Sequence, residues 1–130
     1  METNTASDPR RRLGTLGERL ACDHLRRAGY DVVDMNFRSR QGELDIVATD
    51  SRTLVFCEVK TRVTGGTTGP ASPLEAIGRD KQRRLRRLAA EWLSHPGHAR
   101  GAPELRFDAI GVLVDPRGEL LSLEHVENAF

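Results

Sequence analysis

Residues 43–60 read Glu-Leu-Asp-Ile-Val-Ala-Thr-Asp-Ser-Arg-Thr-Leu-Val-Phe-Cys-Glu-Val-Lys, and this stretch decides the fold. Two largely apolar runs, residues 43–49 and 53–61, flank the short polar connection Asp50-Ser51-Arg52, a pattern that predicts a β-hairpin. Each run carries charged residues at the end that lies away from the turn. A charge in a strand that should be buried is unfavourable unless it is paired or binds a metal. The stretch therefore predicts two core strands that end in an ion-pair cluster or a metal site.

The acids of this hairpin are expected to converge. Side chains alternate between the two faces of a strand, so Glu43 shares a face with Asp45, and Glu58 shares a face with Lys60. Asp45 and Glu58 lie at similar distances from the turn, and a one-residue slip in register would move one of them to the opposite face. The return strand is apolar up to Glu58, which puts the carboxylates at the mouth of a core strand.

Carboxylates gathered in this way suit phosphodiester hydrolysis. Oxygen ligands from Asp45 and Glu58 match Mg²⁺ or Mn²⁺, and Glu43 adds a third carboxylate. A dication there neutralises charge on phosphoryl oxygens and activates a water molecule, while Lys60 could hold that water or a phosphate oxygen. The alternative is a same-face ion pair on an exposed edge strand. The apolar residues that share the face of Glu58 favour the metal site.

Further elements are expected on both sides of the hairpin. A leucine stripe predicts a helix that begins at Asp8-Pro9 and ends at Gly29. A second helix is expected to begin at Pro73 with Ser72 as its N-cap, and to stop before Pro96. Strands are expected over residues 30–37, 43–49, 53–61, 105–114 and 120–126. The predicted order is one helix, three strands, one helix and two strands.

Length and composition indicate one domain. The 130 residues, 38% of them hydrophobic, suit a single domain over residues 9–130 with a flexible tail at 1–8. No apolar stretch approaches the roughly 20 residues of a membrane-spanning helix, and the N-terminus does not read as a secretory signal. Cys22 and Cys57 have no CxxC partner and are interpreted as core residues, so a cytoplasmic location is expected. The histidines, His24 among them, lack ligand-like spacing and are interpreted as incidental.

Several motifs resemble those of known nucleases. Asp45 followed by Glu58-x-Lys60 resembles the PD-(D/E)xK signature of the restriction-endonuclease-like superfamily. A wider set resembles the YraN-like uncharacterised bacterial family, which is similar to archaeal Holliday-junction resolvases. The motifs of this wider set are Gly17-Glu18, Asn36-Phe37-Arg38, Gly42-Glu43-Leu44-Asp45-Ile46-Val47, Phe56-Cys57-Glu58-Val59-Lys60-Thr61-Arg62 and Asn128-Ala129-Phe130. The likeness covers nearly the whole chain, from about residue 13 to residue 130.

The resemblance implies an α/β fold with a restriction-endonuclease-like core, in which helices flank a mixed central sheet. It also implies metal binding by Asp45 and Glu58, with Lys60 beside the scissile phosphate. Glu18 matches a first-helix glutamate that reaches the site in resolvase-like relatives, so the resemblance gives Glu18 a site role. The sequence departs from the family at Cys57, where valine is expected, and this swap leaves the catalytic residues unaffected.

Basic residues supply candidates for binding a nucleic-acid backbone. Lys81 takes an inward position on the second predicted helix, and we expect it to point at the acidic cluster rather than reach for solvent. Arg62 continues the face of Glu58 and could grip a neighbouring phosphate. Arg38, just before the turn into Glu43, is a weaker candidate of the same kind. The remaining candidates are helix arginines expected to face solvent: Arg83, Arg84 and Arg87. A further basic run occupies residues 10–12. From charge alone, the simpler interpretation of such runs is a solvated helix face.

The leading hypothesis is a Mg²⁺- or Mn²⁺-dependent endonuclease that hydrolyses DNA, including branched DNA structures. The alternative is a non-catalytic module that binds nucleic acid or another partner and retains a nuclease-like site. A third hypothesis is a structural domain with a buried ion-pair cluster. The expected partner is nucleic acid, and no membrane partner is expected. A homodimer is compatible with the leading hypothesis, because a junction cutter needs two active sites.

Overall fold

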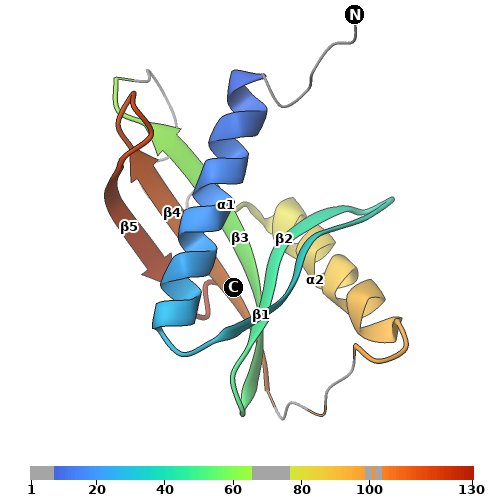
Figure 1. Ribbon diagram of the computed structural model, residues 1–130. Coiled ribbons are helices and arrows are strands. Elements are labelled where there is room, and N and C mark those ends of the chain that lie inside the picture. The colour runs from blue at the N-terminus through green and yellow to red at the C-terminus, as the bar shows by residue number, and fades with distance from the viewer. Residues whose placement is uncertain (1–7, 66–76, 99–100, 102–103) are drawn as a thin grey trace, which may run out of the picture.

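A five-stranded mixed sheet lies between two helices (Figure 1). The computed structural model describes residues 8–65, 77–98, 101 and 104–130. Its elements are α1 (Pro9–Arg27), β1 (Asp31–Ser39), β2 (Gly42–Thr49), β3 (Thr53–Val63), α2 (Arg79–Ser94), β4 (Glu104–Val114) and β5 (Leu120–Val126). This order confirms the predicted succession of helices and strands, and the α/β class with it.

The sheet follows the chain order β1-β2-β3-β4-β5. Only β3 and β4 run parallel, because α2 lies between them in the chain and forms the crossover. The other neighbours are antiparallel. Strand β3 is therefore central, and its first five residues, from Thr53 to Cys57, are all buried.

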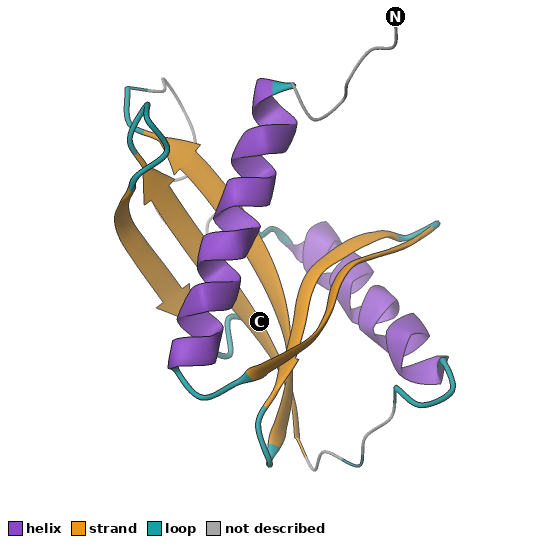
Figure 2. Cartoon of the chain, viewed as in Figure 1, coloured by secondary structure: helices purple, strands orange, loops and turns teal. Residues whose placement is uncertain are grey.

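Each helix covers one face of the sheet (Figure 2). Helix α1 packs Ala21, Cys22 and Leu25 onto a core that includes Ile46 and Val55. Helix α2 packs its apolar side onto the opposite face. The main residues of that second core are Val47, Phe56, Leu85, Leu88, Trp92 and Phe107. Neither described helix is long and apolar enough to cross a bilayer.

Helix α1 begins as predicted, whereas α2 does not. The Asp8 carboxylate accepts a hydrogen bond from the Arg10 backbone N–H at 3.0 Å, and Pro9 takes the first helical position. Helix α2 begins at Arg79, because Gly78 has an extended backbone with ψ of 175° that interrupts any longer helix. The predicted start at Ser72-Pro73 lies outside the described residues. Ile77 is buried and lies eight residues before the buried Leu85, so it keeps the helical spacing of the apolar residues although it precedes the helix.

The predicted β2–β3 hairpin forms, and its register puts Asp45 and Glu58 at equal distances from the turn. Asp50 closes its turn by accepting hydrogen bonds from the backbone N–H groups of Arg52 and Thr53. Pairing between β2 and β3 extends from Thr49–Leu54 to Ile46–Cys57 and then stops. Strand β2 continues to pair with β1 as far as Gly42, while β3 continues beside β4 as far as Val63. The β1–β2 arm and β3 therefore diverge (Figure 1). Asp45 and Glu58 directly follow the last β2–β3 pair, so they lie where the strands separate.

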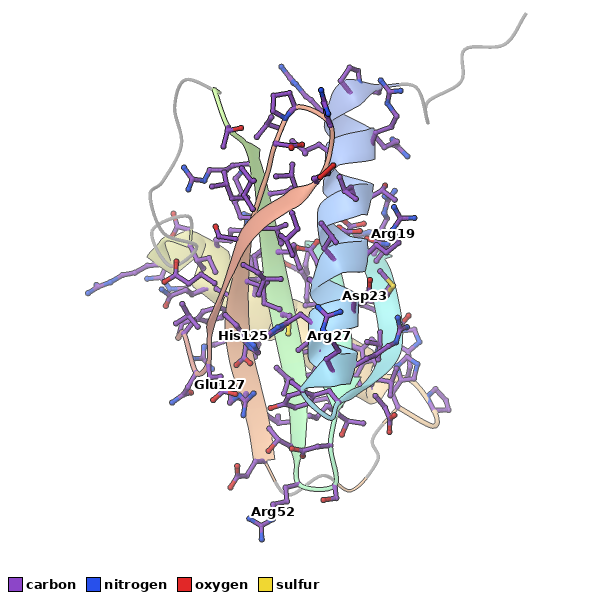
Figure 3. All side chains as sticks on the ribbon, turned by 60° about the vertical axis from the view of Figure 1, so that its left-hand side comes forward. Arg19, Asp23, Arg27, Arg52, His125 and Glu127 are labelled. Atoms are coloured by element: carbon purple, nitrogen blue, oxygen red, sulfur yellow. The ribbon has the colours of Figure 1, made fainter. Side chains whose placement is uncertain are left out.

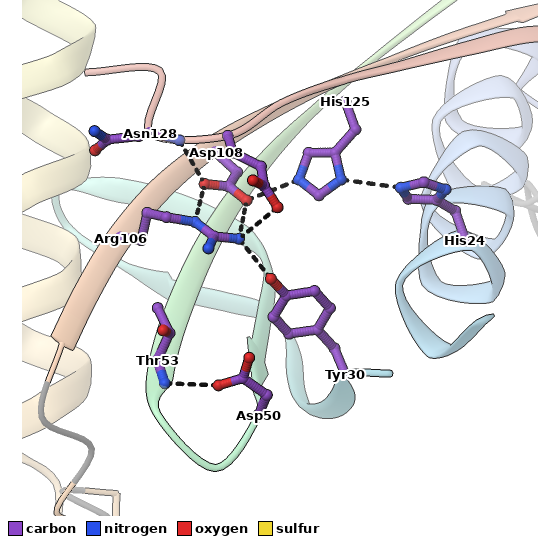
Figure 4. Close-up of polar contacts among 9 residues, drawn as sticks. His24, Tyr30, Asp50, Thr53, Arg106, Asp108, His125 and Asn128 are labelled. Atoms are coloured by element: carbon purple, nitrogen blue, oxygen red, sulfur yellow. Dashed lines mark hydrogen bonds and ion pairs between the residues drawn. The ribbon is translucent and has the colours of Figure 1, made fainter. Parts of the chain in front are cut away.

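A buried polar network joins α1 to β4 and β5 (Figure 4). The fully buried Asp108 carboxylate accepts two hydrogen bonds from Arg106 at 2.9 Å and one from His125 Nε2 at 2.7 Å. His125 Nδ1 in turn lies 2.9 Å from His24 Nε2. His125 lies beside the C-terminal half of α1 (Figure 3). The interpretation of His24 as incidental is therefore wrong, because it bonds a residue 101 positions away in sequence.

Candidate functional site

Asp45 is the centre of the acidic cluster. Its side chain is buried, and Oδ2 accepts a hydrogen bond from the Val59 backbone N–H at 2.8 Å. This bond forms just beyond the last β2–β3 pair, so the carboxylate satisfies a backbone donor that the separating strands leave free. The divergence of the two strands thus holds Asp45 in a fixed position.

Four carboxylates from three elements surround this point. Glu18 comes from α1, Glu43 and Asp45 come from β2, and Glu58 comes from β3. Oxygen atoms of Glu18, Glu43 and Asp45 lie within 4.8 Å of one another. Glu58 lines the same small cavity as Asp45 and Glu43, and its charge acts on Asp45. The site therefore includes each acid that the sequence and the resemblance suggested.

Burial and like charge act together on these acids. Burial raises the pKa of Asp45 to about 8, and the Glu58 charge adds to the increase, against the opposing hydrogen bond from Val59. The pKa of Glu18 is also raised, first by burial and then by the charge of Glu43. A cation bound among the carboxylates would relieve both effects.

Gly17 allows α1 to approach the site. A Cβ atom built on Gly17 would lie 1.7 Å from Thr61 Oγ1 and 2.8 Å from Thr61 Cβ. Only glycine permits this contact between the helix and β3, three residues beyond Glu58. The close approach brings the neighbouring Glu18 to the carboxylates of β2. This contact explains why a glycine directly precedes Glu18 in the sequence.

Lys81 points at the acidic cluster, as predicted. Its ammonium group lies 2.5 Å from Glu58 Oε2, and the Glu58 side chain is only 12% exposed. Arg84 and Leu88 of α2 join Lys81 in lining a cavity of about 240 Å³ beside Glu58. Glu43, Asp45 and Glu58 line this cavity as well, so three carboxylates and two cations meet in one small pocket.

Lys60 lies outside the acidic cluster. It is exposed, two residues after Glu58 on β3, and pairs across the sheet with Gly111. Within the described part of the chain it forms no ion pair with the carboxylates. Arg62 is half-buried further along the same strand and pairs with Leu113. Lys60 and Arg62 therefore lie along β3 beyond Glu58, at increasing distance from the acidic cluster.

The arginine candidates lie around the β1–β2 arm and on α2, and all four are exposed. Arg38 Nε donates to Glu43 at 2.8 Å. Arg87 Nε donates to Gln41 Oε1 at 3.0 Å, which ties α2 to the tip of the arm. Arg83 pairs with Asp80 at 2.8 Å, and Arg84 lines the cavity beside Glu58.

Sequence reasoning missed Asn36 and the N-terminal arginines as neighbours of the acids. Asn36 adopts a positive φ of 56° in β1 and lines a cleft with Glu18 and Glu43. Arg10 and Arg11 line the same cleft. Among residues other than glycine, asparagine adopts this left-handed backbone most readily, so the residue type at position 36 is itself a sequence signal. The position of the arginines depends on how α1 crosses the sheet, which no local pattern encodes.

The donors present fit a hard dication. Every ligand atom at the site is a carboxylate oxygen, the type that Mg²⁺ and Mn²⁺ prefer. Burial, and after it the charges of neighbouring acids, raise the pKa values of Asp45 and Glu18, and a bound cation would favour their charged forms. Asp108 differs, because its carboxylate is already engaged by Arg106 and His125.

Comparison with known proteins gives one consistent family. A family model described as "Uncharacterised protein family UPF0102" matches residues 17–112. A UPF0102 protein of Rhodococcus jostii is 45% identical over 118 residues, which cover 91% of this chain and 95% of that protein. Relatives in Kineococcus radiotolerans and Geobacter metallireducens are 46% and 42% identical, and cover 88% and 91% of this chain and 89% and 91% of their own lengths. The chain therefore belongs to the uncharacterised protein family UPF0102.

Proposed function

We propose that this protein is a divalent-metal-dependent nuclease with a restriction-endonuclease-like core, and that its substrate is DNA. One observation carries the proposal: four carboxylates from three elements converge where β2 separates from β3. Such convergence is electrostatically unfavourable without a cation. A fold that maintains it is best explained by a metal that the acids hold.

Each residue of the site has a role in this proposal. Asp45 and Glu58 would hold Mg²⁺ or Mn²⁺, and Glu18 and Glu43 would orient water beside it. The bound metal would supply charge neutralisation and a more acidic water. Lys60 would meet a phosphate oxygen of the substrate from the open side of β3, which agrees with its exposure.

Glu58 and Lys81 add a constraint on metal binding. The Lys81 ammonium already neutralises Glu58, so a dication at Asp45 must share Glu58 with that ammonium or displace it. Lys81 would then be free to contact the phosphate backbone. This exchange fits the position of Lys81 in the small cavity that it shares with Asp45 and Glu58.

A cleavage screen tests the proposal. Linear duplexes, single strands, flaps and four-way junctions are incubated with Mn²⁺ or Mg²⁺ and analysed on denaturing gels. Wild-type protein is expected to cut at least one of them. Asp45→Asn, Glu58→Gln and Lys60→Met are each expected to reduce the rate by at least about 10²-fold.

Glu127→Gln is the matched control, because Glu127 belongs to the Asp108 network and lies away from the site. It is expected to cut at the wild-type rate. Cleavage that persists unchanged in Asp45→Asn would show a contaminating nuclease and count against the proposal. Absence of cleavage on every substrate with both metals would overturn it.

A second candidate function is a nucleic-acid-binding module without catalysis. The separation of Lys60 from the carboxylates, and the pairing of Glu58 with Lys81, favour it. In that case DNA affinity would be the same in wild type, Asp45→Asn and Lys60→Met, and no metal would change it. Metal-dependent cutting would exclude this candidate.

A further inference from the structure

A basic cleft lies on the α1 side of the acidic cluster, opposite α2. It has a volume of about 680 Å³ and separates the N-terminal half of α1 from the β1–β2 arm. Arg10, Arg11 and Gly14 of α1 form one wall, and Arg38 of β1 belongs to the other. Glu18 and Glu43 line the same cleft and also belong to the acidic cluster. The cleft therefore leads directly to the carboxylates.

Helical spacing explains how α1 forms its wall. Residues three or four apart lie on one face of a helix, so Arg10, Gly14 and Glu18 form one row, and Arg11 and Thr15 run beside it. A Cβ atom on Gly14 would meet nothing within 4 Å, so this part of the wall is open. Eight residues of helix separate Arg10 from Glu18 by about 12 Å. Since one DNA strand advances about 3.4 Å per phosphate along the helix axis, this distance corresponds to about three nucleotides.

Charge in the cleft is arranged for a polyanion. Arg10 and Arg11 lie about two helical turns before Glu18 along α1, so these two cations stand apart from the carboxylates. Arg38 is already paired with Glu43, whereas Arg10 and Arg11 form no ion pair within the described residues. Free guanidinium groups at the mouth of such a cleft attract phosphate oxygens.

We infer that Arg10 and Arg11, with Arg38 opposite, bind the phosphate backbone of a DNA strand that enters the site along α1. This inference rests on the proposed nuclease function and extends it to a second binding wall. The basic residues of α2 contact the strand on the other side of the acidic cluster. Contacts of this kind are to phosphates, so they confer affinity without sequence preference.

The arginine run supplies its own control. Arg11 lines the basic cleft, whereas its neighbour Arg12 lines a different, largely apolar cavity with Leu13, Leu16 and Val114. Arg11 and Arg12 are both exposed and carry the same charge. Arg10 lines both cavities, whereas Arg11 and Arg12 each line one. Arg11→Ala and Arg12→Ala therefore change net charge and helix composition equally, and differ in which cavity loses an arginine.

The test is DNA affinity measured by fluorescence anisotropy on the full chain, with a labelled duplex and a labelled single strand, in Ca²⁺ and at several salt concentrations. Arg11→Ala is expected to weaken binding about fivefold at low salt, and to reduce the slope of log affinity against log salt by about 0.9 for the duplex. Arg12→Ala should stay within about twofold of wild type, since it loses no phosphate contact. Thermal unfolding should be equal in both variants.

The results separate this inference from the proposed function. Equal affinities of Arg11→Ala and Arg12→Ala for both DNA forms would overturn the inference even if the protein cleaves DNA. A selective loss in Arg11→Ala would support the inference even if no cleavage occurs, and only the nuclease proposal would then fail. Wild-type protein that binds neither DNA form would overturn the inference as well.

Discussion

At Asp45, burial and neighbouring negative charges both oppose ionisation of the carboxyl group. It is held by the Val59 N–H, buried, and adjacent to three other acids. Because the folded protein raises the pKa of Asp45 from 3.8 to about 8, the folded state binds this proton more tightly than the unfolded state. The contribution of Asp45 to stability is therefore fully present below about pH 4 and is lost as pH rises toward 8.

Asp45→Asn should remove this pH dependence. The amide oxygen can still accept the Val59 hydrogen bond, but it carries no charge. In EDTA, we expect the variant to exceed wild type in unfolding free energy by up to about 5 kcal/mol at pH 8, and the difference to vanish near pH 4. Urea denaturation over this pH range measures both proteins. A difference that stays constant with pH would show that Asp45 has an ordinary pKa.

Gly17 is a second residue of interest, because the absence of a Cβ atom there lets α1 pack closely on β3. Gly17→Ala would force a Cβ atom against Thr61, so α1 must shift away from β3. We expect a loss of about 2 kcal/mol in unfolding free energy. The control is Gly14→Ala on the same helix, where space is open and better helix propensity should raise stability by up to about 1 kcal/mol. Equal effects of the two substitutions would refute the close contact.

At the scale of elements, the Asp108 network joins α1 to β4 and β5. Burial alone would raise the pKa of Asp108, but hydrogen bonds from His125, Arg106 and the Asn128 backbone lower it below its usual range. The stabilisation by these hydrogen bonds is therefore present at pH values above the ordinary pKa of an aspartate. It is lost as the pH falls through the lowered pKa of Asp108. The network therefore stabilises the protein at neutral pH and fails in acid.

Asp108→Asn tests this network. Removing the charge leaves Arg106 without its main partner, and a loss of about 3 kcal/mol is expected at pH 7 in urea denaturation. Asp80→Asn is the matched control. Asp80 pairs with Arg83 at 2.8 Å, much as Asp108 pairs with Arg106 at 2.9 Å, but the Asp80 side chain is 98% exposed. The control should leave stability unchanged, and an equal loss in both would mean that burial is unimportant here.

The elements also show what local sequence patterns could and could not predict. The hairpin was predictable because Asp50-Ser51-Arg52 forms the turn, and counting from the turn puts Asp45 and Glu58 at similar distances from it. The exact register was not predictable, and the pairs from Thr49–Leu54 to Ile46–Cys57 establish it. The start of α2 was not, because Gly78 interrupts the backbone while Ile77 still keeps the helical spacing of the apolar residues. The spacing of hydrophobic residues indicates which side chains are buried, and here a buried side chain, Ile77, precedes the first residue of the helix.

At the scale of the whole molecule, the site combines local and distant contributions. The three acids of β2 and β3 follow from hairpin register, which the sequence encodes locally. Glu18 reaches them only because Gly17 lets α1 cross close to β3, and the resemblance suggested this position while periodicity left it undecided. The Arg10–Arg11 wall and the His24–His125 contact depend on how α1 lies across the sheet, so no single segment could reveal them.

The central claim is that the acids at the divergence of β2 and β3 hold a catalytic dication. Direct Mn²⁺ binding, followed by electron paramagnetic resonance at pH 8, tests it without requiring the right DNA substrate. Wild type is expected to bind Mn²⁺ saturably, Asp45→Asn to lose that binding, and Glu127→Gln in the Asp108 network to retain it. Mn²⁺ binding that is absent from wild type, or equal in wild type and Asp45→Asn, would contradict the account.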